Sequence, residues 1–356
     1  MITFIIKKIK KLNNINFRFD LPESKKILQY DELHSDILKK IIKRDFNIMP
    51  RHKTEIYFWI FIKQVFFFDF SFLTYFKNYV KFTSTKIVIT LIDNDLFYYT
   101  LKDHLKDVYF IAIQNGVRPQ SSKIFQNKNS NFFKNLKCDY FFLFNKYLIK
   151  KFEKNLQSEY HVLGNYKNNL IKINKTKYRN SFLFISRGEV SFNLMKLIAT
   201  YFNNSNKKLN ILIKQKSYIG AKSEMDFFNK FFNSNCIFLK PNTWEKSYKI
   251  LDKFENIIST NSTLGYEAIS RKKKVALLRF DKDNQIEDFG WPIKNSRTRN
   301  FISARKMTYS ELKRVLDNVV NCKQSHWEKK YYSNIKDLMH FDKNSSKVKK
   351  LISKLL

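Results

Sequence analysis

Short apolar runs alternate with segments of helical spacing along most of this chain, and that alternation restricts its fold. Lys86 to Ile92 is a β-branched run, Leu96 to Leu105 has a helical period, and Val108 to Ile113 is apolar again. Strands that alternate with helices predict parallel sheets. Further strands are expected at 26–30, 46–48, 140–144, 182–185, 209–213, 236–239, 257–258 and 275–278, with helices at 33–43, 146–156, 192–202, 225–232 and 244–251. The chain is therefore predicted to be an α/β protein.

A polar segment rich in Asn and Lys, Gly164 to Asn180, separates two such alternating halves. A length of 356 residues suits two domains of ordinary size. We predict an N-terminal Rossmann-like domain over 1–165, a linker over 166–180, and a C-terminal Rossmann-like domain over 181–356. Helices at 308–320 and 327–338 are expected to complete the second domain. The two parallel-sheet domains are expected to face each other across a cleft.

The formal net charge of +36 limits the classes of partner. A surface this basic attracts phosphates, whether in nucleotides, anionic lipids or nucleic acids. The cationic residues are spread over the whole length, and no zinc-finger spacing or RNA-binding aromatic motif accompanies them, so no specific nucleic acid is expected. Three distant cysteines without a CxxC pair indicate neither a disulfide framework nor zinc, and they fit a reducing cytoplasm.

The Phe-rich segment Ile56 to Phe76 has two interpretations. It is long enough to cross a bilayer, but Lys63, Gln64 and Asp69 lie inside it, and a central charge costs roughly 2.5–3.5 kcal/mol on insertion. We expect one helix that continues to about Tyr79 without spanning a membrane. It is expected either to pack in a core or to lie on a lipid surface.

Polar residues follow two neighbouring strands of the first half. Asp93, Asn94 and Asp95 follow one, and Gln114, Asn115, Gly116 and Arg118 follow the next. Carboxyl ends of parallel strands meet at one edge of a sheet, where ligands bind. Arg118 offers a planar fork suited to phosphate or carboxylate. The alternative for Asp93 is an ordinary strand-end turn. The triplet from Asp93 to Asp95 is also the one metal-type motif in the sequence, although we expect no metal and no cofactor.

A hydroxyl-rich turn, Ser259 to Thr263, precedes a short helix in the second half. The start of a helix presents unpaired N–H groups to a phosphate, and Glu267, one turn into the helix, could accept ribose hydroxyls. The alternative is an N-capped core helix that buries Leu264 and Ala268. Strand ends at Ser186-Arg187 and at Lys214 offer further phosphate contacts. The basic run Arg271 to Lys274 is expected to be a solvated turn.

Four motifs carry a resemblance to a known family. They are I-D-N at 92–94, Q-N-G-V-R at 114–118, S-T-L-G-Y-E-A at 262–268 and G-W-P at 290–292. The chain resembles, over nearly its whole length, bacterial surface-carbohydrate biosynthesis proteins with a GT-B-like glycosyltransferase architecture. The resemblance implies a donor site of Ser186, Arg187, Lys214, Ser262, Thr263 and Glu267, and an acceptor side of Asn94, Gln114, Asn115 and Arg118. Related transferases often have Arg where this chain has Lys214.

The resemblance implies transfer of a sugar from a nucleotide-activated donor to a lipid-linked or saccharide acceptor of a surface polysaccharide or lipopolysaccharide. An inverting transfer needs a base near the acceptor hydroxyl, and Asp93 is the candidate. The expected location is the cytoplasmic face of the inner membrane, on anionic lipid. Three alternatives stay open: a polyol-phosphate or Kdo-type transferase with a CDP- or CMP-linked donor, a non-catalytic scaffold of the same fold, and non-specific nucleic-acid binding with a steep salt dependence. The oligomeric state is not predicted.

Overall fold

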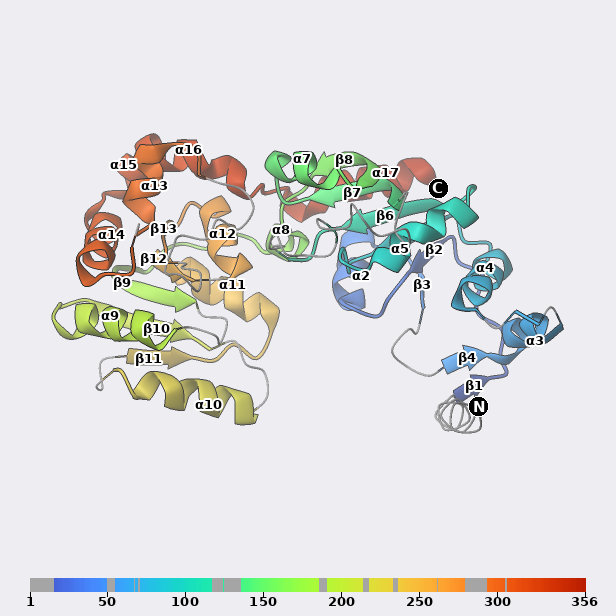
Figure 1. Cartoon of the computed structure of the whole chain (residues 1–356), viewed down its shortest axis with the longest axis horizontal. Helices are drawn as coiled ribbons and strands as arrows, with labels where there is room; N and C mark the ends of the chain where they lie inside the picture. Colours follow the sequence, from blue (N-terminus) through green and yellow to red (C-terminus); the bar gives the residue numbers. More distant parts are fainter. Residues whose placement is uncertain are drawn as a thin grey trace.

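A computed structural model gives the architecture of the chain, with two α/β domains side by side (Figure 1). Each domain is built on its own parallel sheet. The structure describes residues 16–49, 55–66, 68–69, 71–116, 124, 136–185, 191–213, 218–232, 236–260, 262–278, 293–304 and 306–356.

The N-terminal domain contains a six-stranded sheet in the order β3-β2-β5-β6-β7-β8, and all of its neighbouring strands are parallel. Its buried strands are short apolar runs, which explains why the alternation in the sequence located most of them. The strands are β2 (Ile27–Gln29), β3 (Asn47–Ile48), β5 (Ile87–Thr90), β6 (Tyr109–Ile113), β7 (Leu136–Leu143) and β8 (Leu156–Val162). The helical elements between them are α2 (Ser35–Ile42), α5 (Leu96–Thr100), η1 (Leu101–His104), η4 (Lys146–Leu148) and α7 (Ile149–Phe152).

The C-terminal domain contains a five-stranded parallel sheet in the order β11-β10-β9-β12-β13. The first strand after the linker, β9, therefore lies at the centre. The strands are β9 (Tyr178–Ile185), β10 (Lys208–Leu212), β11 (Cys236–Leu239), β12 (Phe254–Ser259) and β13 (Lys274–Leu277). The helices are α9 (Phe192–Asn203), α10 (Tyr218–Asn229), α11 (Trp244–Lys253), α12 (Thr263–Ser270), α13 (Ser296–Ile302) and α14 (Tyr309–Asn321).

The end of the chain returns to the first domain, which corrects the expected assignment of all residues after 181 to the second. The last helix, α17 (Ser346–Leu355), contacts α2 and buries Val348 and Ile352 in the same core as Ile37 and Ile41. The chain reaches it through α15 (Gln324–His326), η5 (Trp327–Tyr332), α16 (Ser333–Ile335), η6 (Lys336–Leu338) and η7 (Lys343–Ser345). The apolar face of α17 determined that it would pack, but not on which domain.

The segment that returns to the first domain packs closely against it at Gly164. Gly164 has φ +78° and is bridged to Phe341, and a Cβ at this position would lie 1.9 Å from the carbonyl oxygen of His340. Asn145 Nδ2 donates to the carbonyl oxygen of Leu338 at 2.8 Å and helps to hold the same segment. Only glycine tolerates both this backbone conformation and this contact.

The Phe-rich segment differs from the single helix expected over 56–79. It forms β4 (Glu55–Tyr57), which pairs with β1 (Asn16–Arg18), and then two helices, α3 (Phe58–Phe66) and α4 (Phe72–Phe82). Ser71 caps α4 by accepting from the backbone N–H of Thr74, and Asp69 accepts from the N–H of Ser71. Side chains that compete for backbone N–H groups favour helix starts over helix interiors. Within the described ranges, none of the helices combines the length and the apolar character that a membrane crossing requires.

Two other boundaries differ from the sequence expectations. Helix 146–156 is only two short helical pieces, because strand β8 begins at Leu156. The expected linker contains a helix, α8 (Tyr166–Leu170), capped by Asn165, whose side chain accepts from the N–H of Lys167. The connecting segment is thus reduced to residues 171–177, and α8 is available to bridge the two domains.

Candidate functional site

The polar ends of β5 and β6 lie together, as their parallel pairing requires. The backbone N–H of Asn115 donates to Asp93 Oδ1 at 2.9 Å, and Tyr99 donates to the carbonyl oxygen of Asp93 at 2.8 Å. Asp93 is fully buried, whereas Asn94 beside it is exposed. The carboxylate of Asp93 therefore fixes the loop after β6 and leaves Asn94 at the surface of this edge.

Gln114 braces the same edge from inside the sheet. Its Oε1 accepts from the backbone N–H of Phe144 at 2.9 Å, and its Nε2 donates to the carbonyl oxygen of Gly116 at 3.0 Å. Gln114 is fully buried, so in this conformation it orders the loop that Asn115 begins. Arg118, the remaining residue expected on the acceptor side, lies outside the described residues.

The hydroxyl-rich turn of the second domain follows β12 and ends in the N-cap of α12. Ser262 Oγ accepts from the N–H of Leu264 at 3.3 Å, and Thr263 is the first residue of the helix. Gly265 lets α12 approach the strand, because a Cβ there would lie 2.1 Å from Ser259 Oγ. Three of the expected donor contacts, Ser186, Arg187 and Lys214, lie outside the described residues.

Glu267 is buried between the two domains. Asn165 Nδ2 donates to Glu267 Oε1 at 3.0 Å, and the hydroxyl of Tyr248 on α11 donates to Glu267 Oε2. Burial first, and then the charge of Glu267, raises the pKa of Tyr248 well above its ordinary value, so this hydroxyl keeps its proton. The contact with Asn165, 102 residues away, makes Glu267 a link between the second domain and α8.

Helix α8 joins the two predicted halves of the site. Tyr166, next to Asn165, donates its hydroxyl to Asn115 Oδ1 at 2.9 Å. A continuous set of hydrogen bonds thus runs from Asp93 through Asn115 to α8 and on to Glu267. Burial is the largest cause that raises the pKa of Tyr166 well above its ordinary value, and the charge of Asp93 is the next. The carboxyl edges of the two sheets therefore meet at one buried polar junction.

Several residues of this junction were not expected from the sequence; they are Asn165, Tyr166, Tyr248, Lys167 and His34. Lys167 Nζ lies 2.9 Å from His34 Nε2 and 3.5 Å from Asn115 Oδ1. His34 begins α2 in a left-handed conformation, with φ 59°. The signal that could have found His34 is its place in the loop between β2 and α2, because that loop lies at the same edge of the sheet as Asp93. No sequence pattern marks Lys167 as a site residue, because it lies in the segment that was expected to be a linker.

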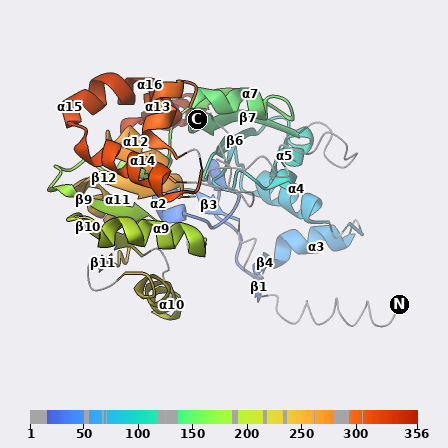
Figure 2. The ribbon, with the colours of Figure 1, turned by 60° about the vertical axis from the view of Figure 1, so that its left-hand side comes forward.

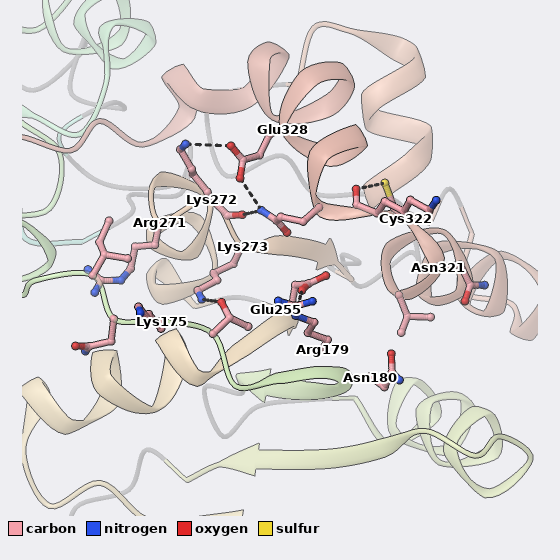
Figure 3. A pocket seen from close by; sticks show the side chains of 16 residues that line it. Lys175, Arg179, Asn180, Glu255, Arg271, Lys272, Lys273, Asn321, Cys322 and Glu328 are labelled. Atoms are coloured by element: carbon pink, nitrogen blue, oxygen red, sulfur yellow. Dashed lines mark hydrogen bonds and ion pairs between the residues drawn. The ribbon is translucent and has the colours of Figure 1, made fainter.

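A basic cavity of about 630 Å³ lies at the opposite end of β12 from the hydroxyl turn (Figure 3). It is bordered by the connecting segment, the turn between α12 and β13, and the region from the end of α14 to η5. This turn is the basic run 271–274, which the sequence analysis expected to be solvated. That expectation is wrong, because Arg271, Lys273 and Lys274 are buried and only Lys272 is exposed.

Residues that are distant in sequence form ion pairs or hydrogen bonds with these buried cations. Arg271 forms an ion pair with Asp252, and Lys274 Nζ lies 2.8 Å from Glu255 Oε1. Lys273 Nζ donates to Thr176 Oγ1 at 2.9 Å and to the carbonyl oxygen of Asp252 at 2.6 Å. Burial lowers the pKa of Lys273, and the nearby Asp252 opposes that shift.

Comparison with known families matches the greater part of the chain. A family model described as "putative O-antigen biosynthesis protein" matches residues 111–192 and 189–356. The comparison with curated proteins gave no match.

Several solved structures share the fold over nearly the whole chain. A glycosyltransferase from Rickettsia africae is 11% identical with a TM-score of 0.55, and the alignment covers 92% of this chain and 98% of that one. MnaA from S. aureus, solved with UDP, is 10% identical with a TM-score of 0.53 over 93% and 96%. A UDP-GlcNAc 2-epimerase from Methanocaldococcus jannaschii, in complex with UDP-GlcNAc and UDP, is 12% identical with a TM-score of 0.50 over 92% and 99%. The chain therefore has the expected GT-B-like fold, with parallel sheets in separate Rossmann-like domains.

Proposed function

The chain belongs to the O-antigen biosynthesis family whose model covers residues 111–356, and from this premise we propose that it is a glycosyltransferase. It transfers a sugar from a nucleotide-activated donor to a lipid-linked or saccharide acceptor during surface polysaccharide or lipopolysaccharide assembly. The observation that carries the proposal is the hydrogen-bonded junction between Asp93 and Glu267, which brings two carboxyl sheet edges together. The fold also supports it, because its neighbours include a glycosyltransferase and structures with bound UDP.

The donor nucleotide is assigned to the second domain. Ser262, Thr263 and the start of α12 face the diphosphate, where backbone N–H groups and hydroxyls stabilise the charge of the leaving group. Ser186, Arg187 and Lys214 are assigned to the same diphosphate from their places after β9 and β10 in the sequence. We assign Glu267 to the ribose hydroxyls, with donor binding replacing its contact to Asn165.

The acceptor is assigned to the first domain, beside the exposed Asn94. Asp93 would take the proton of the acceptor hydroxyl as that oxygen attacks the anomeric carbon and the nucleotide leaves. This requires the loop of Asn115 to move, because its N–H now occupies Asp93 Oδ1. Asn115 and Arg118 are assigned to acceptor contacts, and Gln114 to holding their loop in place. The proposal includes neither a metal ion nor a cofactor.

A binding screen tests the donor site. UDP, GDP, CDP and CMP are titrated by calorimetry against the wild type, Glu267→Gln and the control Glu23→Gln, whose carboxylate pairs with Lys25 on the first domain, away from the turn. We expect one ligand to bind, and Glu267→Gln to weaken it at least tenfold, about 1.4 kcal/mol. The control should bind as the wild type does. Equal binding by Glu267→Gln would remove the donor assignment, and no binding by any nucleotide would favour a scaffold.

The identity of the ligand and the fate of a sugar nucleotide separate the remaining alternatives. A preference for CDP or CMP would indicate the polyol-phosphate or Kdo-type transferase. Incubation with UDP-GlcNAc distinguishes transfer from epimerisation, because an epimerase would convert the sugar nucleotide into its 2-epimer without an acceptor. We expect no epimer, and we expect Asp93→Asn to keep donor affinity while it loses transfer.

We further propose that the protein acts at the cytoplasmic face of the inner membrane and contacts anionic lipid through α3. Phe66 and Phe68, at and just after the end of this helix, are 76% and 86% exposed, and Trp59 is half exposed. Helices α3 and α4 carry three lysines and no acidic residue. In both views these helices lie at the far side of the first domain from the second (Figure 2). Exposed aromatic residues beside cations suit an anionic lipid surface.

Vesicle flotation tests this contact. The double variant Phe66→Ser/Phe68→Ser should bind phosphatidylglycerol vesicles at least fivefold more weakly than the wild type. The matched control Phe192→Ser/Ile237→Ser removes two apolar side chains that are each 53% exposed on the other domain, and it should bind normally. Unchanged flotation of the α3 variant would exclude this helix as the lipid contact.

A further inference from the structure

The basic cavity beside the connecting segment has an excess of positive charge. Its lining contains six cationic side chains and two carboxylates, from Glu255 and Glu328. The cations come from three places in the chain, so the fold brings the basic run together with cations that are distant in sequence. The six are Lys175, Arg179, Arg271, Lys272, Lys273 and Lys323.

Part of this charge is compensated within the protein. Arg271 is paired with Asp252, Lys272 Nζ lies 3.0 Å from Glu328 Oε2, and Glu255 is taken by Lys274 at 2.8 Å. These contacts use both carboxylates of the lining.

Three of the remaining cations have either one long ion pair or, among the described residues, none. Arg179 lies 3.9 Å from Glu255 and its side chain is 81% exposed. Among the described residues, neither Lys175 nor Lys323 is in an ion pair, and both are exposed at the rim. In Figure 3, Lys175 and Arg179 approach from the connecting segment and the start of β9, on the opposite side of the cavity from Glu328 and Cys322. Like charges gathered around one cavity repel each other, and an anion placed among them lowers that energy.

We propose that this cavity binds a phosphate-bearing ligand at a second anion site, distinct from the donor turn. A volume of about 630 Å³ accommodates more than one phosphate group. The cations Lys175, Arg179 and Lys323 surround the ligand, and the side-chain amides of Asn180 and Asn321 supply neutral donors. The site lies at the amino ends of β9 and β12, whereas the hydroxyl turn follows the carboxyl end of β12.

The ligand would act on the segment that connects the domains. Arg271 donates to the carbonyl oxygens of Ile171 and Lys172, and Asp252 accepts from the N–H of Asn174 at 2.9 Å. Lys175 follows directly on this anchored segment. An anion held between Lys175 and Lys323 therefore fixes the connecting segment to the second domain and restricts the hinge between the two domains.

Alkylation of Cys322 by iodoacetamide, measured peptide by peptide with mass spectrometry, reports occupancy of this cavity. Cys322 lines it and is partly exposed, and burial raises the pKa of its thiol, so it reacts slowly. Cys236, also partly exposed, lies on β11 outside the cavity lining and serves as the control in the same sample. The probe is inorganic pyrophosphate at constant ionic strength.

We expect pyrophosphate to slow the alkylation of Cys322 at least threefold and to leave Cys236 unchanged. The double variant Lys175→Ala/Lys323→Ala should lose this protection, whereas Ser262→Ala in the donor turn should keep it. Protection by phosphatidylglycerol vesicles, lost in the same double variant, would identify a lipid headgroup as the source of the phosphate. The proposal is overturned if neither probe protects Cys322, if Cys236 is protected equally, or if the double variant is still protected. Because the readout is local, a failed donor site leaves this result unaffected.

Discussion

The buried guanidinium of Arg271 offers the sharpest test of how the second domain is held together. All five of its N–H donors are used: Nε and Nη2 donate to the two oxygens of Asp252 at 2.7 and 2.6 Å, and the others to Asn168 Oδ1 and to the carbonyl oxygens of Ile171 and Lys172. Both side chains of the ion pair are 0% exposed.

Replacing Arg271 by Met leaves the carboxylate of Asp252 buried without its counter-charge. Removing one partner of such a pair costs about 3–5 kcal/mol. With an m value of about 3 kcal/mol per molar urea, the unfolding midpoint should fall by about 1–1.7 M. Lys272→Met is the matched control, because Lys272 belongs to the same basic run but is 56% exposed. Its surface ion pair is worth about 0.2–1 kcal/mol.

Urea unfolding followed by far-UV circular dichroism measures these changes, and a double-mutant cycle isolates the ion pair. Asp252→Leu should also be strongly destabilising, because it leaves Arg271 buried and charged. The double variant Arg271→Met/Asp252→Leu should lose less unfolding free energy than the two single variants lose together, since it buries no isolated charge. A loss below about 1 kcal/mol for Arg271→Met, or strict additivity in the cycle, would refute the reasoning.

Two further predictions concern packing and pH. Gly265→Ala should destabilise the protein by about 1–3 kcal/mol through overpacking against Ser259, and Ser259→Gly in the same chain should recover part of the loss in urea unfolding. An unchanged midpoint for Gly265→Ala would contradict the close approach of α12. Burial lowers the pKa of His340 below its ordinary value of 6.5, so the unfolded chain takes up a proton before the folded one does. The free energy of unfolding should therefore fall as the pH drops from above 6.5 through the folded-state pKa. His340→Gln should flatten that decline between pH 7.5 and 5. Equal dependence of the unfolding free energy on pH in both proteins would disprove it.

The sequence by itself determined the layers of the fold and the polar ends of the strands. The apolar runs located most strands of both sheets, because the strands of parallel sheets are buried on both faces and need no alternating pattern. The proximity of Asp93 and Asn115 followed from the same logic, since residues after neighbouring parallel strands share an edge. His34, in the loop between β2 and α2, lies at the same edge of the sheet, although the sequence does not distinguish it from an ordinary helix start.

Contacts between distant segments were decided only by the tertiary structure. The run from Arg271 to Lys274 looks solvated in sequence, because nothing nearby reveals that Asp252 and Glu255 will meet it in the interior. The docking of α17 on the first domain and the bridging role of Asn165 have the same origin. Local patterns show that a helix has an apolar face or that a side chain carries a charge. Which partner satisfies that face or charge is set by the packing of the whole chain, because burial is favourable only where a complementary group is already in place.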